Sequence, residues 1–245
     1  MRPGERVDDL QRNGYRILQN PQKPCFGLDA VLLSEFARVK RGEQVLDLGT
    51  GTGILPILLA AKTEGYSFTG LELQSDLAEM AQRSVGLNAL EGRVFVEEGD
   101  LREASVRFGR AAFDVVVSNP PYMKGEQGRK NPEEARALAR HEIACTLEDV
   151  VRETARVLRV GGRFYLVHRP RRLGEIFAAL HRHQLEPKRM RLVYPYADRK
   201  ANLVLLEAVR GGKPGMKVEA PLIIYREPGR YTSEMCGIYR GSEPI

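Results

Sequence analysis

The stretch VLDLGTGTG at residues 45–53 constrains this chain more than any other part of its sequence. A short apolar run stops at an acidic residue and continues into Gly49, Gly51 and Gly53, and residues 54–62 then have the composition of a helix. Glycines at a strand-to-helix turn let the backbone approach a ligand, because no Cβ stands in the way. The alternative interpretation is a tight turn that binds nothing.

The spacing of these glycines distinguishes two classes of ligand. A dinucleotide-binding turn has the pattern G-x-G-x-x-G. That pattern would require a glycine at position 54, where this chain has Ile54. An aspartate, Asp47, also stands two residues before the first glycine. The turn therefore does not have the pattern that binds a pyrophosphate.

Length and composition predict one α/β domain with additions. The chain has 245 residues, of which 42% are hydrophobic and 29% charged, enough for a sizeable buried core. We expect a single domain over residues 1–245, with an N-terminal extension and entry helix at 1–40, a core at 41–210 and a C-terminal tail at 211–245. The chain has no apolar run of about 18 residues, and its first residues lack the apolar stretch of a signal peptide. We expect no membrane association and a cytoplasmic location.

Cysteine and histidine spacing argues against a metal site. The three cysteines stand far apart and form no C-x-x-C pair, so neither a disulfide framework nor a zinc cluster is predicted. The four histidines form no H-x-x-x-H pair, and we expect them to be ordinary surface or core residues. Ser118 lacks the G-x-S-x-G context of a hydrolase nucleophile. No metal is expected.

The two halves of the chain differ in charge. Residues 1–120 contain 14 Lys and Arg against 17 Asp and Glu, whereas residues 121–245 contain 24 against 15. The overall charge of +6 therefore divides into −3 and +9. A basic half beside a mildly acidic half predicts that a polyanion lies along one side of the molecule. The alternative is a basic surface that only keeps the protein in solution.

Apolar runs of strand length alternate with segments of helical periodicity. This order is typical of a parallel sheet with right-handed crossover connections. We expect an α/β fold with a Rossmann-like, seven-stranded and mostly parallel sheet flanked by helices, plus short N-terminal and basic C-terminal additions. The expected strands are residues 44–48, 66–71, 93–97, 113–117, 163–168, 188–194 and 202–209, and the expected helices are residues 28–39, 54–62, 75–90, 146–158 and 173–183.

Polar side chains stand at the ends of the first four expected core strands. Because the carboxyl ends of parallel strands share one edge of the sheet, where ligands bind, we expect these side chains to form one site. Four strand ends that contribute to one polar site are stronger evidence than any single motif. In chain order the four residues are Asp47, Glu72, Asp100 and Asn119.

Two of these carboxylates suit a nucleoside. Glu72 stands 19 residues after Gly53 and can accept two hydrogen bonds from the vicinal hydroxyls of a ribose. The alternative for Glu72 is a solvated surface carboxylate. Asp100 can accept a hydrogen bond from the exocyclic amine of an adenine, and its alternative role is to cap a turn. With the glycine turn, the two residues predict a nucleoside pocket.

The same residues resemble a known family. The stretch DLGTGTG at residues 47–53, with Glu72, Asp100 and the tetrapeptide NPPY at residues 119–122, is similar to the S-adenosylmethionine-dependent class I methyltransferases. The resemblance covers about residues 25–210 and implies S-adenosylmethionine as the cofactor. The cofactor-binding residues that we expect from these motifs are Asp47, Gly49, Gly51, Gly53, Glu72, Leu73, Asp100 and Leu101.

The tetrapeptide NPPY implies the acceptor chemistry, because it marks the members that methylate planar nitrogens. These nitrogens are the exocyclic amines of bases and the side-chain amides of glutamine, whose delocalised lone pairs make them poor nucleophiles. The side-chain oxygen of Asn119 and the carbonyl of Pro120 can each accept one N–H bond and favour a pyramidal nitrogen. Tyr122 offers a face on which a flipped base stacks. The alternative is a proline-rich turn without a function.

Two further stretches narrow the resemblance. FGLDAVLL at residues 26–33, and GGKPG at 211–215 followed by PLIIY at 221–225, are similar to the tRNA(Val) adenosine-37 N6-methyltransferase family. This resemblance implies that Phe26 and Asp29 border the cofactor and that the basic half binds tRNA. Asp29 equally suits the N-terminus of a helix. The basic residues expected to meet phosphates are Arg169, Arg171, Arg172, Lys188, Arg189, Arg191 and Lys213.

Three functions are compatible with these motifs. The first is a tRNA adenine-N6 methyltransferase. The second is a protein-glutamine N5-methyltransferase that acts on translation release factors, which shares the NPPY motif. The resemblance implies that those enzymes carry a helical N-terminal domain ahead of this core. In this sequence about 43 residues precede the first expected core strand, which are too few for such a domain. The third is a non-catalytic RNA-binding module, which would not require NPPY. A monomer is the expected state.

Overall fold

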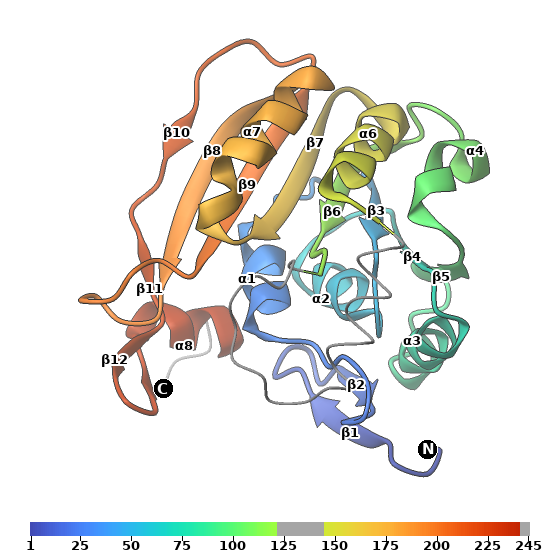
Figure 1. Ribbon diagram of the computed structural model, residues 1–245. Helices are drawn as coiled ribbons and strands as arrows, with labels where there is room; N and C mark the ends of the chain where they lie inside the picture. Colours follow the sequence, from blue (N-terminus) through green and yellow to red (C-terminus); the bar gives the residue numbers. More distant parts are fainter. Residues whose placement is uncertain (122–144, 241–245) are drawn as a thin grey trace.

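The central sheet of the computed structural model positions the helices and the candidate site. The structure describes residues 1–121 and 145–240, so the expected stacking residue Tyr122 lies outside the described residues. Within them, nine strands form the sheet in the order β10-β8-β9-β7-β6-β3-β4-β5, with β11 also paired to β8 (Figure 1). The strands are β3 (Gln44–Leu48), β4 (Ser67–Glu72), β5 (Val94–Glu98), β6 (Phe113–Ser118), β7 (Leu158–His168), β8 (Leu185–Tyr194), β9 (Leu203–Arg210), β10 (Lys217–Val218) and β11 (Leu222–Ile223).

The expected seven-stranded, mostly parallel sheet is confirmed, with two short strands added beside β8. β3 to β7 run parallel to one another. β9 alone runs the other way, because it pairs antiparallel with both β7 and β8. The carboxyl ends of all the other strands therefore lie at one edge, which we call the carboxyl edge, and the opposite edge is the amino edge.

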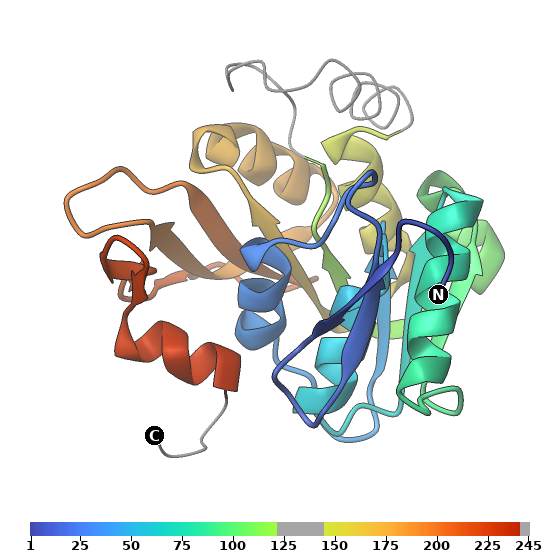
Figure 2. The ribbon, with the colours of Figure 1, turned by 90° about the horizontal axis from the view of Figure 1, so that it is seen from below.

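Helices cover both faces of the sheet. α1, α2 and α3 pack on one face, and α4, α6 and α7 on the other (Figures 1 and 2). β7 shows how its sequence serves both layers, because Tyr165 belongs to the first core and its neighbour Phe164 to the second. The helices are α1 (Leu28–Phe36), α2 (Ile54–Lys62), α3 (Ser75–Leu87), α4 (Ala104–Phe108), α6 (Leu147–Val157), α7 (Leu173–Arg182) and α8 (Ser233–Arg240), with single turns η1 (Leu101–Glu103) and η2 (Pro170–Arg172).

Element ends differ from the sequence expectation in several places. α1 ends at Phe36, because Ala37 already has extended dihedrals of φ −69° and ψ 134°. β7 begins at Leu158, directly after α6 and five residues before the expected strand at 163–168. The 3-10 turn η1 and the short helix α4 were not expected.

Both termini add small elements that are not part of the nine-stranded sheet. β1 (Arg6–Asp9) pairs with β2 (Arg16–Gln19), and this hairpin packs on α3. At the other end β12 (Tyr225–Glu227) pairs with β13 (Arg230–Tyr231) ahead of α8. Tyr225 packs between the β8–β9 loop and β13. Its ring centroid lies 5.5 Å from that of Tyr196 in the loop and 5.1 Å from that of Tyr231 in β13.

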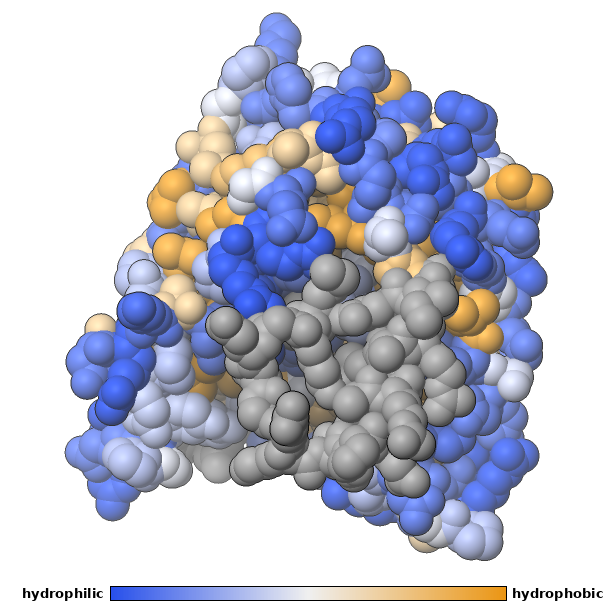
Figure 3. Space-filling model, viewed as in Figure 1, coloured by the Kyte–Doolittle hydropathy of each residue, from blue (hydrophilic) through white to orange (hydrophobic). Residues whose placement is uncertain are grey.

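The surface of the face seen in Figure 1 is largely hydrophilic, and apolar residues gather over α7 and β8 (Figure 3). Among residues 1–121 and 145–240, no helix is both long and apolar enough to cross a membrane.

Candidate functional site

A cavity of about 870 Å³ opens at the carboxyl edge. The turns that follow β3, β4, β5, β6 and β7 all contribute to its wall, and so does the β8–β9 loop. The strand ends therefore meet as the sheet topology requires. Glu72, Asp100 and Asn119 lie in the wall, whereas Asp47 does not.

The glycine turn after β3 adopts a backbone that few other residues tolerate. Gly49, Gly51 and Gly53 have φ values of +79°, +57° and +84°, all in the left-handed region. Gly53 is also the N-cap of α2, and a Cβ there would lie 3.1 Å from the Cβ of Ala81 in α3. Gly49 and Gly51 line the cavity, while Gly53 stands behind it and lets α2 pack against α3.

Backbone N–H groups of the glycine turn donate to acceptors within the protein. The N–H groups of Gly49 and Thr50 donate to the carbonyl of Leu71 at 2.9 and 3.1 Å, and Gly51 donates to Glu72 Oε2 at 2.9 Å. A pyrophosphate site needs such groups turned toward the ligand. The geometry therefore agrees with the glycine spacing in excluding a dinucleotide turn.

Glu72 is a buried, oriented carboxylate at the end of β4. It is 3% exposed, and its Oε1 accepts the N–H of Gln74 at 2.9 Å. Each carboxylate oxygen has a second lone pair, so both retain acceptor capacity while the two backbone bonds fix the plane of the group. Leu73, beside it, is 44% exposed and also lines the cavity.

Asp47 lies beneath the glycine turn, which corrects the expectation that it borders the cofactor. It is 1% exposed and absent from the cavity wall. The Thr50 hydroxyl interacts with its carboxylate and favours the charged form, although among the residues that the structure describes no donor meets hydrogen-bond geometry at either oxygen. Burial, with a smaller contribution from the charge of Glu72, raises the pKa of Asp47 to about 7.

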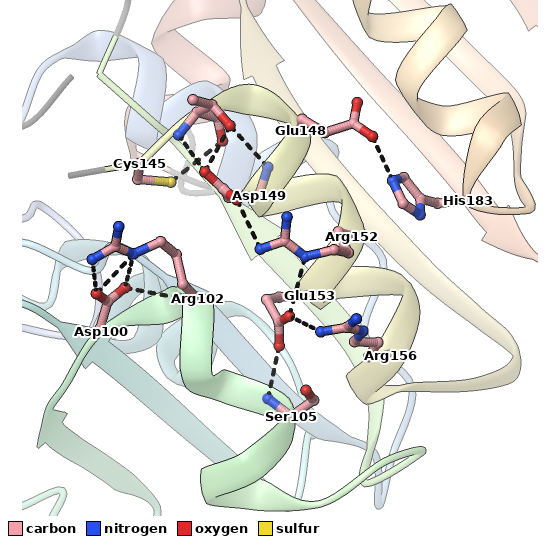
Figure 4. A network of polar contacts seen from close by, with 11 residues as sticks. Asp100, Arg102, Ser105, Cys145, Glu148, Asp149, Arg152, Glu153, Arg156 and His183 are labelled. Atoms are coloured by element: carbon pink, nitrogen blue, oxygen red, sulfur yellow. Dashed lines mark hydrogen bonds and ion pairs between the residues drawn. The ribbon is translucent and has the colours of Figure 1, made fainter. Parts of the chain in front are cut away.

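Asp100 caps a turn, which is one of the two roles that the sequence left open, and it also lines the cavity. Its Oδ1 accepts the N–H of Arg102 at 2.8 Å and caps η1, and its carboxylate also pairs with the Arg102 guanidinium (Figure 4). The Arg102 hydrogen bonds hold the pKa of Asp100 below its usual value. Asp100 and the half-buried Leu101 both line the cavity.

The α6 side of the wall is held by a polar network (Figure 4). Thr146 and Asp149 form a capping box at the start of α6. The fully buried Glu153 accepts the N–H of Ser105 at 3.0 Å and pairs with Arg156, which ties α6 to α4. Cys145, in the wall ahead of α6, has a pKa raised to about 12 by burial and remains a thiol.

Phe26 and Asp29 line the cavity as well. Asp29 stands in the first turn of α1, where a carboxylate favours the helix, and it lines the cavity as well. The segment that carries Phe26 leads from β2 into α1 and lies in the wall from residue 24 to residue 27.

Asn119 follows β6 and faces this space from the other side. The fully buried Ser118 donates its hydroxyl to the carbonyl of Leu48 at 2.8 Å, which fixes the end of β6 against the end of β3. Asn119, Pro120 and Pro121 then line the cavity.

The seven basic residues expected to bind RNA fall into two groups. Arg169, Arg171 and Arg172 lie in or beside η2 and line the cavity mouth. Arg172 pairs with Glu175 at 2.6 Å, and Arg169 donates to the carbonyl of Asn202 at 3.0 Å. Lys188, Arg189, Arg191 and Lys213 are outside this wall.

Arg189 contradicts the sequence expectation most directly. It is 8% exposed, pairs with Glu207 at 2.7 Å and Glu219 at 3.2 Å, and its guanidinium carbon lies 3.9 Å from the ring centroid of Phe36. A charge so enclosed joins β8 to its neighbours and does not face a phosphate. Arg191 is likewise engaged, since it donates to the carbonyl of Ala220 at 2.9 Å and pairs with Glu234 at 2.6 Å.

The wall contains residues that the sequence analysis did not single out, among them the polar side chains of His168 and Asn202. His168 ends β7, is 1% exposed and has a pKa lowered to about 4 by burial and by nearby arginines, so it is neutral at pH 7. Asn202 lies in the β8–β9 loop. The rule that strand ends line the site would have found His168. Asn202 precedes the antiparallel β9, and its place depends on strand order.

Comparisons with known proteins place this geometry in context. The chain matches the family model described as methyltransferase small domain over residues 28–181. It is 30% identical over 222 residues to a Tolumonas auensis protein named tRNA1(Val) (adenine(37)-N6)-methyltransferase, with 86% of each chain covered. A protein of the same name from Aeromonas salmonicida is 31% identical over 186 residues, with 76% of each chain covered.

Solved structures give the same fold. An Agrobacterium tumefaciens protein described as a predicted O-methyltransferase has 26% identity and a TM-score of 0.71, covering 87% of this chain and 96% of its own. Geranyl diphosphate methyltransferase, solved in complex with SAM, has 17% identity and a TM-score of 0.56 over 75% of this chain and 84% of its own. The second likeness concerns the fold alone.

Proposed function

Because this chain belongs to the methyltransferase small domain family, we propose that it transfers a methyl group from S-adenosylmethionine to the exocyclic N6 amine of an adenosine in tRNA. The relatives named above carry that activity in their names, and we extend it to adenosine 37 of tRNA(Val). A tRNA substrate implies work in the cytoplasm.

The observation that carries this proposal is a single cavity with two unlike sides. Glu72, Asp100 and the glycine turn follow the neighbouring strands β4, β5 and β3 and form one side, which we call the donor side. Asn119, Pro120, His168 and η2 form the other, which we call the acceptor side. A methyl transfer needs both reactants in one enclosed space, because positioning supplies much of the acceleration.

The residues of the donor side fit S-adenosylmethionine. Glu72 presents acceptor capacity for the two ribose hydroxyls, and Asp100 for the adenine amine. Apolar side chains, including Leu73 and Leu101, provide surfaces for the adenine ring. The two carboxylates in this wall, those of Glu72 and Asp100, suit a ligand that carries positive charge. When bound, S-adenosylmethionine supplies an electrophilic methyl group on its sulfonium.

The acceptor side suits a planar amine. The side-chain oxygen of Asn119 and the carbonyl of Pro120 would each accept one N–H of the target nitrogen and direct its lone pair toward the methyl group. No strong base is required before attack, because the nitrogen becomes acidic only when it carries positive charge. His168, with its pKa lowered to about 4, leaves this side of the wall uncharged at that strand end.

The two groups of basic residues indicate where the RNA would lie. Arg169, Arg171 and Arg172 stand at the cavity mouth, where phosphates beside a flipped base would pass. Lys213 follows the end of β9 at the amino edge, because Arg210 pairs with the first residue of β8. We therefore assign tRNA to the carboxyl edge and leave Lys188, Arg189, Arg191 and Lys213 outside the path.

One assay tests this function. The protein is incubated with labelled S-adenosylmethionine and either unmodified tRNA(Val), the same tRNA with adenosine 37 replaced by guanosine, or a translation release factor. We expect label only in the first, recovered as N6-methyladenosine after nuclease digestion. Label in the release factor alone, as N5-methylglutamine, would replace the proposal with the glutamine alternative.

A further inference from the structure

Gln19 is a fully buried amide that joins three segments of the chain. It ends β2 and is 0% exposed. Its Nε2 donates to the hydroxyl oxygen of Thr52 at 2.8 Å and to the carbonyl of Leu18 at 2.9 Å. Its Oε1 accepts the N–H of Phe26 at 3.0 Å. The side chain thus makes three hydrogen bonds without contacting solvent.

The partners fix the orientation of this amide. A backbone N–H such as that of Phe26 can only donate, and a carbonyl such as that of Leu18 can only accept. Oε1 must therefore face Phe26, and Nε2 must face Leu18 and Thr52. The flipped amide would place Nε2 against the N–H of Phe26 and Oε1 against the carbonyl of Leu18. Gln19 therefore has one favourable arrangement.

Two of the three partners belong to the cavity wall, although Gln19 itself does not. Thr52 stands between the second and third glycines of the turn, and Phe26 lies in the segment that leads into α1. These two parts of the wall are far apart in the sequence, and the described hydrogen bonds join them through Gln19.

We propose that Gln19 is a positioning residue for the donor side of the cavity, which it assembles by holding the Phe26 segment against the glycine turn. This inference rests on the proposed function, since it assumes that S-adenosylmethionine binds between these parts. A preassembled wall loses less conformational freedom on binding, so its effect is on cofactor affinity. The chemistry at Asn119, on the acceptor side, does not depend on it.

The chain offers a matched control. Ser84 in α3 is also 0% exposed, and its hydroxyl accepts the N–H of Leu18 at 3.1 Å. It therefore anchors the same strand, one residue from Gln19, but it is not among the residues that line the cavity. Ser84→Ala loosens β2 without releasing either the Phe26 segment or the glycine turn.

The test compares Gln19→Met, Gln19→Glu and Ser84→Ala with the unaltered protein. Binding of S-adenosylhomocysteine is measured by calorimetry, methylation of tRNA by initial rates, and unfolding by urea. Met preserves the volume but loses all three bonds. Ionised Glu retains the acceptor for Phe26, but it brings an oxygen against the carbonyl of Leu18.

For Gln19→Met we expect the Kd of S-adenosylhomocysteine and the KM of S-adenosylmethionine to rise about tenfold or more, with kcat at saturating cofactor within about twofold of the original. Gln19→Glu should behave similarly, and more severely as rising pH ionises the new carboxyl. Ser84→Ala should lower the urea midpoint while the Kd stays within about twofold.

Three outcomes would overturn the inference: an unchanged Kd in folded Gln19→Met, an equal rise of Kd in Ser84→Ala at matched stability, or a loss of kcat with unchanged KM. If Gln19→Met does not fold, Thr52→Val, which removes one of the three bonds, must raise the Kd by about threefold, and no rise overturns it as well. Failure of the unaltered protein to bind S-adenosylhomocysteine would instead contradict the proposed function.

Discussion

The donor and acceptor sides of the cavity are built in different ways. On the donor side, neighbouring strand ends hold each other in place: Glu72 accepts the N–H of Gln74, two residues away, and that of Gly51 on the adjacent turn. On the acceptor side, the wall combines residues that follow β6, residues that follow β7 and the β8–β9 loop, which the order of the sheet alone brings together. A motif can encode the first kind of wall, whereas the second requires the completed fold.

The two sides also differ in charge. Glu72 and Asp100 stand on the donor side, whereas three arginines of η2 and its flank surround the acceptor mouth. This polarity matches a cationic cofactor and a polyanionic substrate. Separate placement of the charges keeps the RNA phosphates away from the carboxylates that they would repel. It also predicts that substitutions on one side leave the other side's ligand largely unaffected.

The largest effect is expected for Asn119→Ala. The variant loses the acceptor that holds the target amine, so the rate of methyl transfer at saturating substrates should fall about 10²–10³-fold. Because Asn119 is on the acceptor side, the Kd of S-adenosylhomocysteine measured by calorimetry should stay within about twofold. A variant with full activity would remove Asn119 from the mechanism, and a large loss of cofactor affinity would break the division into two sides.

Glu72→Gln should have the opposite profile. It replaces a charged acceptor by an amide whose NH₂ must oppose the N–H of Gly51 or Gln74, so cofactor affinity should fall about 10–100-fold. Glu98→Gln is the matched control, since Glu98 pairs beside Glu72 in the sheet but is exposed and outside the wall. Calorimetry on both variants checks this, and equal effects in the two would deny Glu72 a specific role.

Asp47 makes the free energy of unfolding depend on pH. Its pKa is about 7 in the fold and near 3.8 in a free chain, so between these values the folded state holds a proton that the unfolded chain releases. The free energy of unfolding should therefore decrease as the pH rises from about 4 to about 7, by up to ~1.4 kcal/mol per pH unit from this group. Asp47→Asn should remove that contribution.

Urea unfolding of both proteins at several pH values measures the Asp47 effect. Asp76→Asn serves as the control, because Asp76 is exposed and its pKa is lowered by Lys23, so its loss should not flatten the decline. An unchanged slope in Asp47→Asn would show that Asp47 is solvated or paired in solution.

The smallest effect is expected at the RNA path. Arg171→Glu should weaken tRNA binding roughly fivefold and lower the slope of log affinity against log salt by about 1, while Lys213→Glu, an equal charge reversal at the amino edge, should change neither. Fluorescence anisotropy over a salt series measures both. Equal losses in the two variants would mean that RNA contacts both edges, and no loss in either would move its path elsewhere.

The sequence alone determined the fold class, the main strands and most of the donor side. The spacing of the glycines decided the turn, since Gly49, Gly51 and Gly53 all need left-handed backbone, a requirement that acts within single residues. The polar residue after each strand lies where a parallel sheet must place it. Such features depend on local dihedral angles and on chain connectivity, and both can be predicted from the order of the residues.

Only the tertiary structure decided which charged and polar groups serve the site. Arg189 and Arg171 look alike in the sequence, yet Glu207 and Glu219 enclose the first while the second stands at the cavity mouth. Gln19 ends the short strand β2, and only the fold brings Thr52 and Phe26 to its amide. A hydrogen-bond or ion-pair partner is chosen by packing between distant segments, and no local pattern records that choice.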